Sequence, residues 1–236
     1  MSKKQILVPI LVLIVLAAAA SIYYFKPYQA WWPSSGPVLQ NVVDRGLEPA
    51  DREKLENRIA EARTQAEIPT ENGSLDLAKW LELGNLYYQI GDLQAASAAY
   101  DRILAQSPKD APALENKGQA RLEMGDYAGA EDLWRQSLLV NPYEVTYLRL
   151  ANLISQNYPD RRDDARQVLE DGIASLGQQS SFLVALGNWY RAGGDLETAL
   201  SHYEVAKQLD PGNTGLDAVI NEMRLEQIKA FKEANP

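Results

Sequence analysis

Hydrophobic residues recur along most of this 236-residue chain with the spacing of an amphipathic helix. One helix face is formed by Trp80 and by the residues three, four and seven positions after it, which are Leu83, Gly84 and Tyr87. Further stretches of the same kind follow until about residue 234, separated by glycine- and proline-containing turns. The pattern therefore predicts an all-α body.

The helical pattern is also an internal repeat. Five landmarks recur 34 residues later and again 69 residues after that. They are Gly84, Gly118 and Gly187; Gly91, Gly125 and Gly194; Ala96, Ala130 and Ala199; Tyr100, Trp134 and Tyr203; Pro108, Pro142 and Pro211. Because 69 is one more than twice 34, a further copy with one extra residue is expected between the second and the last.

The third copy is the least regular. Ala151, Ala165 and Leu169 fit it if one residue is inserted near residues 158–160, and Asn152 then stands at the glycine position. The repeats predicted in this way are residues 77–110, 111–144, 145–179 and 180–213.

These landmarks resemble those of the tetratricopeptide repeat, a helix-turn-helix unit of 34 residues. In the first copy the family's positions are occupied by Trp80, Leu83, Gly84, Tyr87, Ala96, Tyr100 and Pro108. The resemblance implies a right-handed superhelix of antiparallel helix pairs, which we expect within residues 74–213. Apolar residues in 214–234 predict one more helix that caps the stack.

The N-terminal part has a different character. Residues 1–5 are basic, and residues 6–25 form an uncharged, mainly apolar run whose length matches a bilayer core of roughly 30 Å. Tyrosine and tryptophan residues follow it, as is typical of a membrane interface. We predict a transmembrane anchor with the N-terminus in the cytoplasm and the body on the extracytoplasmic side. A cleaved secretory signal and a helix buried in a partner are the alternatives.

Between the anchor and the repeats, the proline-, serine- and glycine-containing stretch 26–48 predicts an extended linker, and residues 49–68 predict a separate amphipathic helix.

Charge and residue types narrow the chemistry. The formal net charge is −9, and residues 49–236 hold 19 basic against 30 acidic side chains, which disfavours nucleic acid as a partner. There is no cysteine and one histidine, His202, and no catalytic or phosphate-binding motif occurs. We expect no enzymatic activity, cofactor, metal or small-molecule substrate. The charged run Asp160–Asp164 predicts a solvated turn whose ion pairs contribute little.

The resemblance also implies a binding surface. In this family the first helix of each pair lines a groove, and residues at set positions of the repeat contact a bound peptide. Asparagine at these positions can hydrogen-bond to an extended backbone, and apolar residues can form pockets for side chains. The candidates here are Asn85, Tyr88, Gln89, Gln119, Leu122, Arg149, Gln156, Asn188 and Arg191. Asn85 and Asn188 are equally compatible with plain solvated surface positions.

The leading functional hypothesis is a membrane-anchored scaffold or assembly factor that binds protein partners. The resemblance suggests bacterial envelope proteins that help to assemble secretion, pilus, cytochrome or cell-wall machinery. The alternative is a constitutive structural subunit of such a complex, without recognition of a free peptide.

Overall fold

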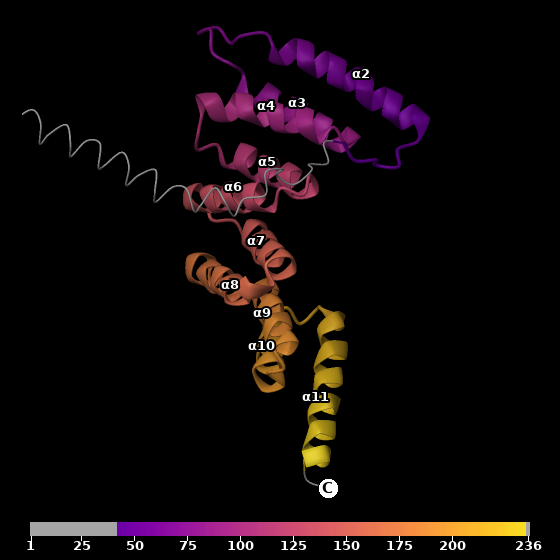
Figure 1. Cartoon of the computed structure of the whole chain (residues 1–236), viewed down its shortest axis with the longest axis vertical. Helices are drawn as coiled ribbons and strands as arrows, with labels where there is room; N and C mark the ends of the chain where they lie inside the picture. Colours follow the sequence, from indigo (N-terminus) through magenta and orange to yellow (C-terminus); the bar gives the residue numbers. More distant parts are fainter. Residues whose placement is uncertain (1–41, 235–236) are drawn as a thin grey trace, which may run out of the picture. The chain divides into compact units, whose positions relative to one another are not determined.

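A computed structural model of the chain describes residues 42–234 (Figure 1). These residues form ten α-helices and one short 3-10 turn, with no β-strand among them. The elements are α2 (Pro49–Ala66), α3 (Leu77–Ile90), α4 (Leu93–Gln106), α5 (Ala111–Glu123), α6 (Tyr127–Val140), α7 (Glu144–Asn157), η1 (Pro159–Arg161), α8 (Arg162–Leu176), α9 (Ser180–Ala192), α10 (Leu196–Leu209) and α11 (Thr214–Ala234).

The basic start 1–5, the anchor 6–25 and most of the linker 26–48 lie outside the described residues. Within residues 42–234, no helix combines the length and the apolar character needed to cross a membrane.

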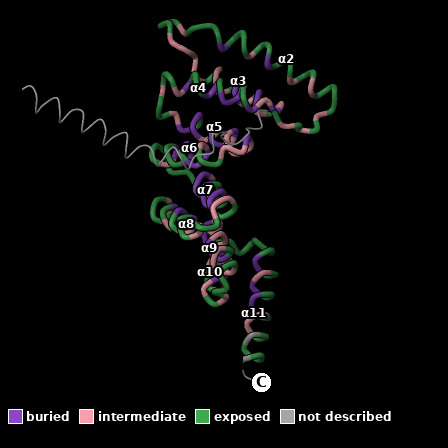
Figure 2. The backbone as a smooth tube through the Cα atoms, in the orientation of Figure 1, coloured by how far each residue is buried: buried purple, intermediate pink, exposed green. Residues whose placement is uncertain are grey.

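Consecutive helices pair and the pairs stack: α3 with α4, α5 with α6, α7 with α8, and α9 with α10. Figure 2 shows buried positions on the faces where helices meet and exposed positions on faces that point away from the stack. The all-α repeat architecture predicted from the sequence is thus confirmed.

A glycine at the helix crossing of the first, second and fourth pairs explains the strongest landmark of the repeat. A Cβ added to Gly84 would lie 2.5 Å from the ring of Tyr100, and one added to Gly118 would lie 2.5 Å from the indole of Trp134. Both rings are fully buried. The second helix of each pair therefore places a large ring against the backbone of the first, and only glycine leaves room for it.

The third pair has no glycine at its crossing, and its register differs from the predicted one. Ala151 is buried at the crossing with 4% exposure, whereas Asn152 is exposed. The helix begins at Glu144, one residue earlier than the predicted repeat, and the turn that contains η1 holds two extra residues rather than one. Leu169 takes the place of the aromatic ring, and this smaller partner leaves room for the alanine side chain.

Aspartate caps mark the starts of five helices. The side chain of the capping residue accepts a hydrogen bond from a backbone amide in the first turn of α3, α4, α5, α6 and α10, which satisfies a donor that has no partner inside the helix. The capping residues are Asp76, Asp92, Asp110, Asp126 and Asp195. They fix where each helix begins.

Helix α2 lies in the range 49–68 where the sequence predicts a helix, and it is part of the stack. Ile59 and Ala66 are buried in one core cluster with Leu83 and Tyr100. Helix α2 thus covers the first repeat pair and is not a separate element of the linker.

Helix α11 covers the other side of the series. Leu216, Ile220 and Met223 are buried against Leu183 and Tyr203 of the last pair. This packing is the capping role predicted for residues 214–234.

The charged turn after α7 is more than a solvated loop. Arg161 binds Glu131 of α6 through two hydrogen bonds of 2.9 and 2.7 Å, and Glu131 is only 8% exposed. Hydrogen bonds from Arg161 lower the pKa of the Glu131 carboxyl, although burial opposes this. The pair joins the second repeat to the third, a contact that the expected solvated turn does not include.

Candidate protein-binding groove

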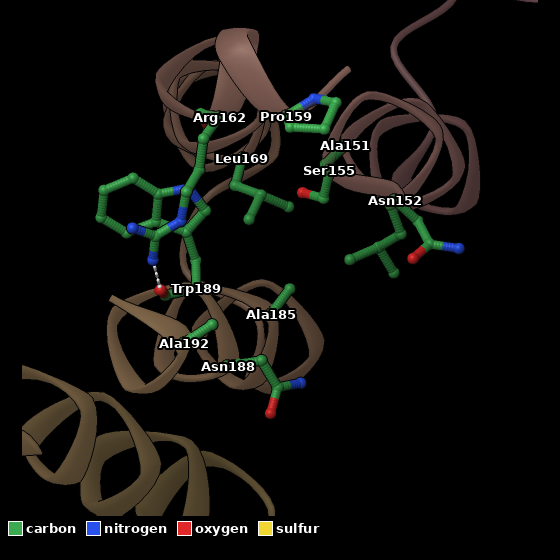
Figure 3. A pocket seen from close by; sticks show the side chains of 11 residues that line it. Ala151, Asn152, Ser155, Pro159, Arg162, Leu169, Ala185, Asn188, Trp189 and Ala192 are labelled. Atoms are coloured by element: carbon green, nitrogen blue, oxygen red, sulfur yellow. Dashed lines mark hydrogen bonds between the residues drawn. The ribbon is translucent and has the colours of Figure 1, made fainter. Parts of the chain in front are cut away.

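The first helices of the repeat pairs line two hollows, which together we call the groove. The first hollow, of about 320 Å³, lies between α3 and α5. The second, of about 400 Å³, lies between α7 and α9 (Figure 3). Among residues 42–234, no group of three or more His, Asp or Glu side chains is placed to hold a metal ion.

Asn85 is central to the first hollow, and half of its amide group is already used inside the protein. Its Oδ1 accepts hydrogen bonds from the hydroxyl of Tyr100 at 2.8 Å and from Nδ2 of Asn116 at 2.9 Å. The structure thus assigns Asn85 a share in holding helices α3, α4 and α5 together. Its own Nδ2 has no hydrogen-bond acceptor among the described residues, and the exposed Gln89 lies beside it on the wall of the hollow.

Tyr88 and Gln119 hold a carboxylate at the edge of this hollow. The hydroxyl of Tyr88 and Nε2 of Gln119 both donate to Oε1 of Glu123, the latter at 3.1 Å. The other oxygen, Oε2, lies 2.8 Å from Nη2 of Arg45. Burial by itself would raise the pKa of Glu123, but these hydrogen bonds and the Arg45 charge together lower it, so the carboxylate is ionised.

Arg45 belongs to the end of the predicted linker, and its position is a correction to that prediction. Residues 42–47 are not a free spacer, because they lie along the turn between α3 and α4. Val42 and Asp92 form an antiparallel bridge, and the amide of Val43 donates to the carbonyl of Gly91 at 2.9 Å.

The second hollow combines an apolar floor with amide groups at its rim. Leu148, Ala151, Leu169 and Ala185 contribute apolar surface, and the polar members are Asn152, Ser155, Asn188 and Arg162. Figure 3 shows Asn152 of α7 and Asn188 of α9 at the edge of the hollow, with Arg162 lying against Trp189. The Arg162 guanidinium carbon is 4.2 Å from the ring centroid of Trp189, whose Nε1 donates to the Arg162 carbonyl at 2.8 Å.

Asn188 is arranged like Asn85, but its Oδ1 accepts one internal hydrogen bond instead of two. Its Oδ1 accepts from the hydroxyl of Tyr203 at 2.7 Å. Its Nδ2, together with the whole side chain of the exposed Asn152, has no partner among the described residues. Two amide groups on neighbouring first helices are thus left with hydrogen-bonding capacity beside an apolar floor.

The other candidate residues fall into different surroundings. Leu122 is partly buried against the core, and Arg191 pairs with Glu222 and Glu226 of α11 at 2.9 and 3.0 Å. Arg149 and Gln156 are exposed, and neither lines a hollow. The corrected register moves the groove position from Arg149 to Leu148.

Sequence reasoning missed Asn152 and Arg162, which line the second hollow, and the contact of Arg45 with Glu123 beside the first hollow. The correct register of the third copy would have aligned Asn152 with Asn85 and Asn188. Nothing in the sequence pattern pairs Arg45 with Glu123.

Stacked antiparallel helix pairs with a glycine at the crossings and hollows along the first helices define a helical-repeat protein. Models of the tetratricopeptide repeat match residues 56–111, 81–141 and 183–215. The chain is therefore a tetratricopeptide-repeat protein, as its resemblance to this family predicts. The first match begins within α2, in agreement with the packing of that helix on the repeats.

Several solved structures share this fold. A crystal structure of MamA has a TM-score of 0.57 at 17% identity and covers 72% of this chain and 96% of its own. MamA from Desulfovibrio magneticus RS-1 reaches 0.54 at 20% identity over 67% and 90% of the two chains. The protein TTC0263 from Thermus thermophilus reaches 0.50 at 18% identity over 75% and 93%. A comparison with curated proteins finds no match.

Proposed function

We propose that this protein is a non-enzymatic, membrane-anchored scaffold or assembly factor whose groove binds an extended segment of a partner protein. The observation that carries the proposal is the second hollow, where the amides of Asn152 and Asn188 flank an apolar floor. An extended peptide offers alternating N–H and C=O groups to such amides, and its side chains enter the space between them.

The net charge and the residue types of the groove agree with a protein ligand. The acidic body disfavours nucleic acid, and both hollows are open to solvent. Amides and tyrosines line the first hollow, and apolar residues and amides line much of the second.

The test compares capture of the partner, by crosslinking the full-length protein in its own membrane, between variants that separate binding from folding. Asn188→Ala removes the amide from the groove but also leaves the hydroxyl of Tyr203 without its acceptor. Tyr203→Phe removes the same internal hydrogen bond and keeps the amide. We expect Asn152→Ala and Asn188→Ala to lose the partner and Tyr203→Phe to retain it. If all three capture the partner equally, groove recognition is wrong.

The location is part of the proposal. We place residues 6–25 across a membrane, with the N-terminus in the cytoplasm and the repeats on the extracytoplasmic side of a bacterial envelope. The chain has no cysteine, so single substitutions Ser2→Cys and Ser201→Cys can be labelled on intact cells with a membrane-impermeant maleimide. Labelling of Ser201→Cys alone agrees with this topology, and labelling of Ser2→Cys alone contradicts it. A mature protein that has lost the first 20 or so residues indicates a cleaved signal instead.

A second candidate is a constitutive subunit of a larger envelope complex of the pilus, secretion or cytochrome-biogenesis type. It is favoured by exposed apolar residues outside the groove: Leu139 is 89% exposed, and Leu225 and Ile228 of α11 are 67% and 51% exposed. If the protein has this function, Leu225→Glu should abolish capture of the partner in the crosslinking experiment, whereas Asn188→Ala should leave it unchanged.

A further inference from the structure

The segment of residues 42–47 lies on the first repeat pair as an extended ligand does. Its residues alternate in burial: Val43, Arg45 and Leu47 are half-buried, whereas the residues between them are exposed. Residues 42–45 thus have one side against the protein, and the chain turns at Gly46, whose φ is +61°. The segment is held by few contacts, one of which is the backbone hydrogen bond from Val43 to Gly91.

Gly91 makes this approach possible. Its φ is +91°, and a Cβ added there would lie 1.9 Å from the carbonyl oxygen of Val43. Gly125, the equivalent residue of the next repeat, has a φ of +84° and no atom within 4 Å of such a Cβ. The first repeat therefore has a backbone contact that the second repeat lacks.

Arg45 enters a site built from two repeats. Its Nε and Nη2 donate to the carbonyl of Tyr88 at 3.3 and 3.1 Å, and its guanidinium carbon lies 4.7 Å from the centroid of the Tyr88 ring. Nη2 also lies 2.8 Å from Glu123, whose carboxylate is oriented by Tyr88 and Gln119. A carbonyl, an aromatic face and an oriented carboxylate match the planar, multidentate guanidinium and not the compact ammonium of lysine.

The first hollow adjoins this site and shares Tyr88 and Gln119 with it, but Arg45 does not line it. A longer ligand that placed an arginine in the site would also reach Asn85 and Gln89. It would gain contacts that residues 42–47 do not make.

We propose that Tyr88, Gln119 and Glu123 form an arginine-binding site, which the chain fills with its own Arg45 and which an arginine-bearing extended segment of the partner takes over. The proposal rests on the groove function above and names the chemistry of the partner. Because Arg45 is tethered, its effective concentration at the site is of millimolar order, so it excludes weak ligands and yields to those that also occupy the hollow.

The site itself is tested with a fluorescent synthetic peptide of residues 38–47 added to the full-length chain. We expect the peptide to bind Arg45→Ala at least about tenfold more tightly than the wild type, where the tethered segment competes. In the Arg45→Ala background, Gly91→Ala should weaken peptide binding, because its Cβ would clash with the carbonyl of Val43 in the peptide. The matched control Gly125→Ala carries similar backbone strain without the clash and should leave peptide binding in that background unchanged.

The chemistry is tested on the Arg45→Ala chain. Adding Glu123→Gln, which keeps the shape of the side chain and removes its charge, should abolish peptide binding. Peptides with alanine or lysine in place of the arginine should bind at least about tenfold less. Failure of the peptide to bind Arg45→Ala, equal binding of the lysine peptide, or binding unaffected by Glu123→Gln would overturn the site.

Exchange with the partner is tested by the capture experiment in the membrane. Arg45→Ala should raise capture several-fold, and Glu123→Gln in that background should return it to the wild-type level or below. If Asn188→Ala loses the partner but neither Arg45→Ala nor Glu123→Gln changes capture, the arginine exchange is wrong and the groove function stands. If Asn188→Ala also has no effect, the groove function itself is wrong.

Discussion

The packing of Gly187 at the crossing of the fourth pair predicts that its replacement by alanine destabilises the protein. In Gly187→Ala the new Cβ would lie 2.8 Å from Cε1 of Tyr203 and 3.0 Å from two further ring atoms. The ring is 1% exposed, and its hydroxyl is held by Asn188, so it cannot move aside without loss of packing or of that hydrogen bond. Overpacking of this kind costs about 1–3 kcal/mol, whereas alanine is favoured over glycine inside a helix by about 1 kcal/mol. We expect a net loss of up to about 2 kcal/mol.

The measurement is urea unfolding of the full-length chain, followed by far-UV circular dichroism and compared through the transition midpoints. Ala174→Gly, at an exposed helical position, measures the helix-propensity term in this fold. Tyr203→Leu combined with Gly187→Ala reproduces the alanine–leucine pair of the third repeat, and the two changes together should cost at least about 1 kcal/mol less than their sum. A Gly187→Ala chain that is more stable than the wild type by the propensity term would refute the packing explanation.

Further predictions concern the cap on α5 and the Arg161–Glu131 ion pair. Asp110→Ala should cost about 1 kcal/mol in urea unfolding through loss of the cap on α5, and Asp110→Asn, which keeps the cap, should cost much less; equal losses would refute the capping role. Arg161→Ala should cost about 1.5–3 kcal/mol, because Glu131 loses two charge-assisted hydrogen bonds, and a loss below about 0.5 kcal/mol would show that the pair is not stabilising. The pKa of Glu131 is lower in the folded protein than its unfolded value of about 4.3. The stabilisation that the ionised carboxylate contributes is therefore present above about pH 4.3 and is lost as the pH falls through the folded-state pKa. Glu131→Gln should flatten this part of the curve of unfolding free energy against pH, and an unchanged curve would contradict this account.

Much of the fold follows from local rules that the sequence displays. A glycine and an aromatic ring sixteen residues later, as in Gly84 and Tyr100, set the crossing of the first, second and fourth pairs and are repeated often enough to be recognised. The third pair was misplaced by one residue because both of its signals had changed together. Ala151 replaces the glycine and Leu169 the ring, and the separation between these two is eighteen residues.

The groove was predicted less well, because its character depends on partners distant in sequence. Asn85 and Tyr88 stand at groove positions, but their hydrogen bonds to Asn116 and Glu123 determine how much of each is left for a ligand. Arg191 is engaged by α11, a contact between residues 31 and 35 positions apart. A periodic pattern identifies a helix face and gives no information on which charges across neighbouring helices will meet.

The most direct test of groove recognition places a photo-crosslinking amino acid at Ser155, inside the second hollow, and at Ala174, which is exposed on α8 and lines neither hollow. In the native membrane we expect the Ser155 probe to capture one partner protein, through an extended segment identified by mass spectrometry, and the Ala174 probe to capture none. Capture of the same protein at both positions, or at Ala174 alone, would show that the partner covers the body of the protein and does not enter the groove.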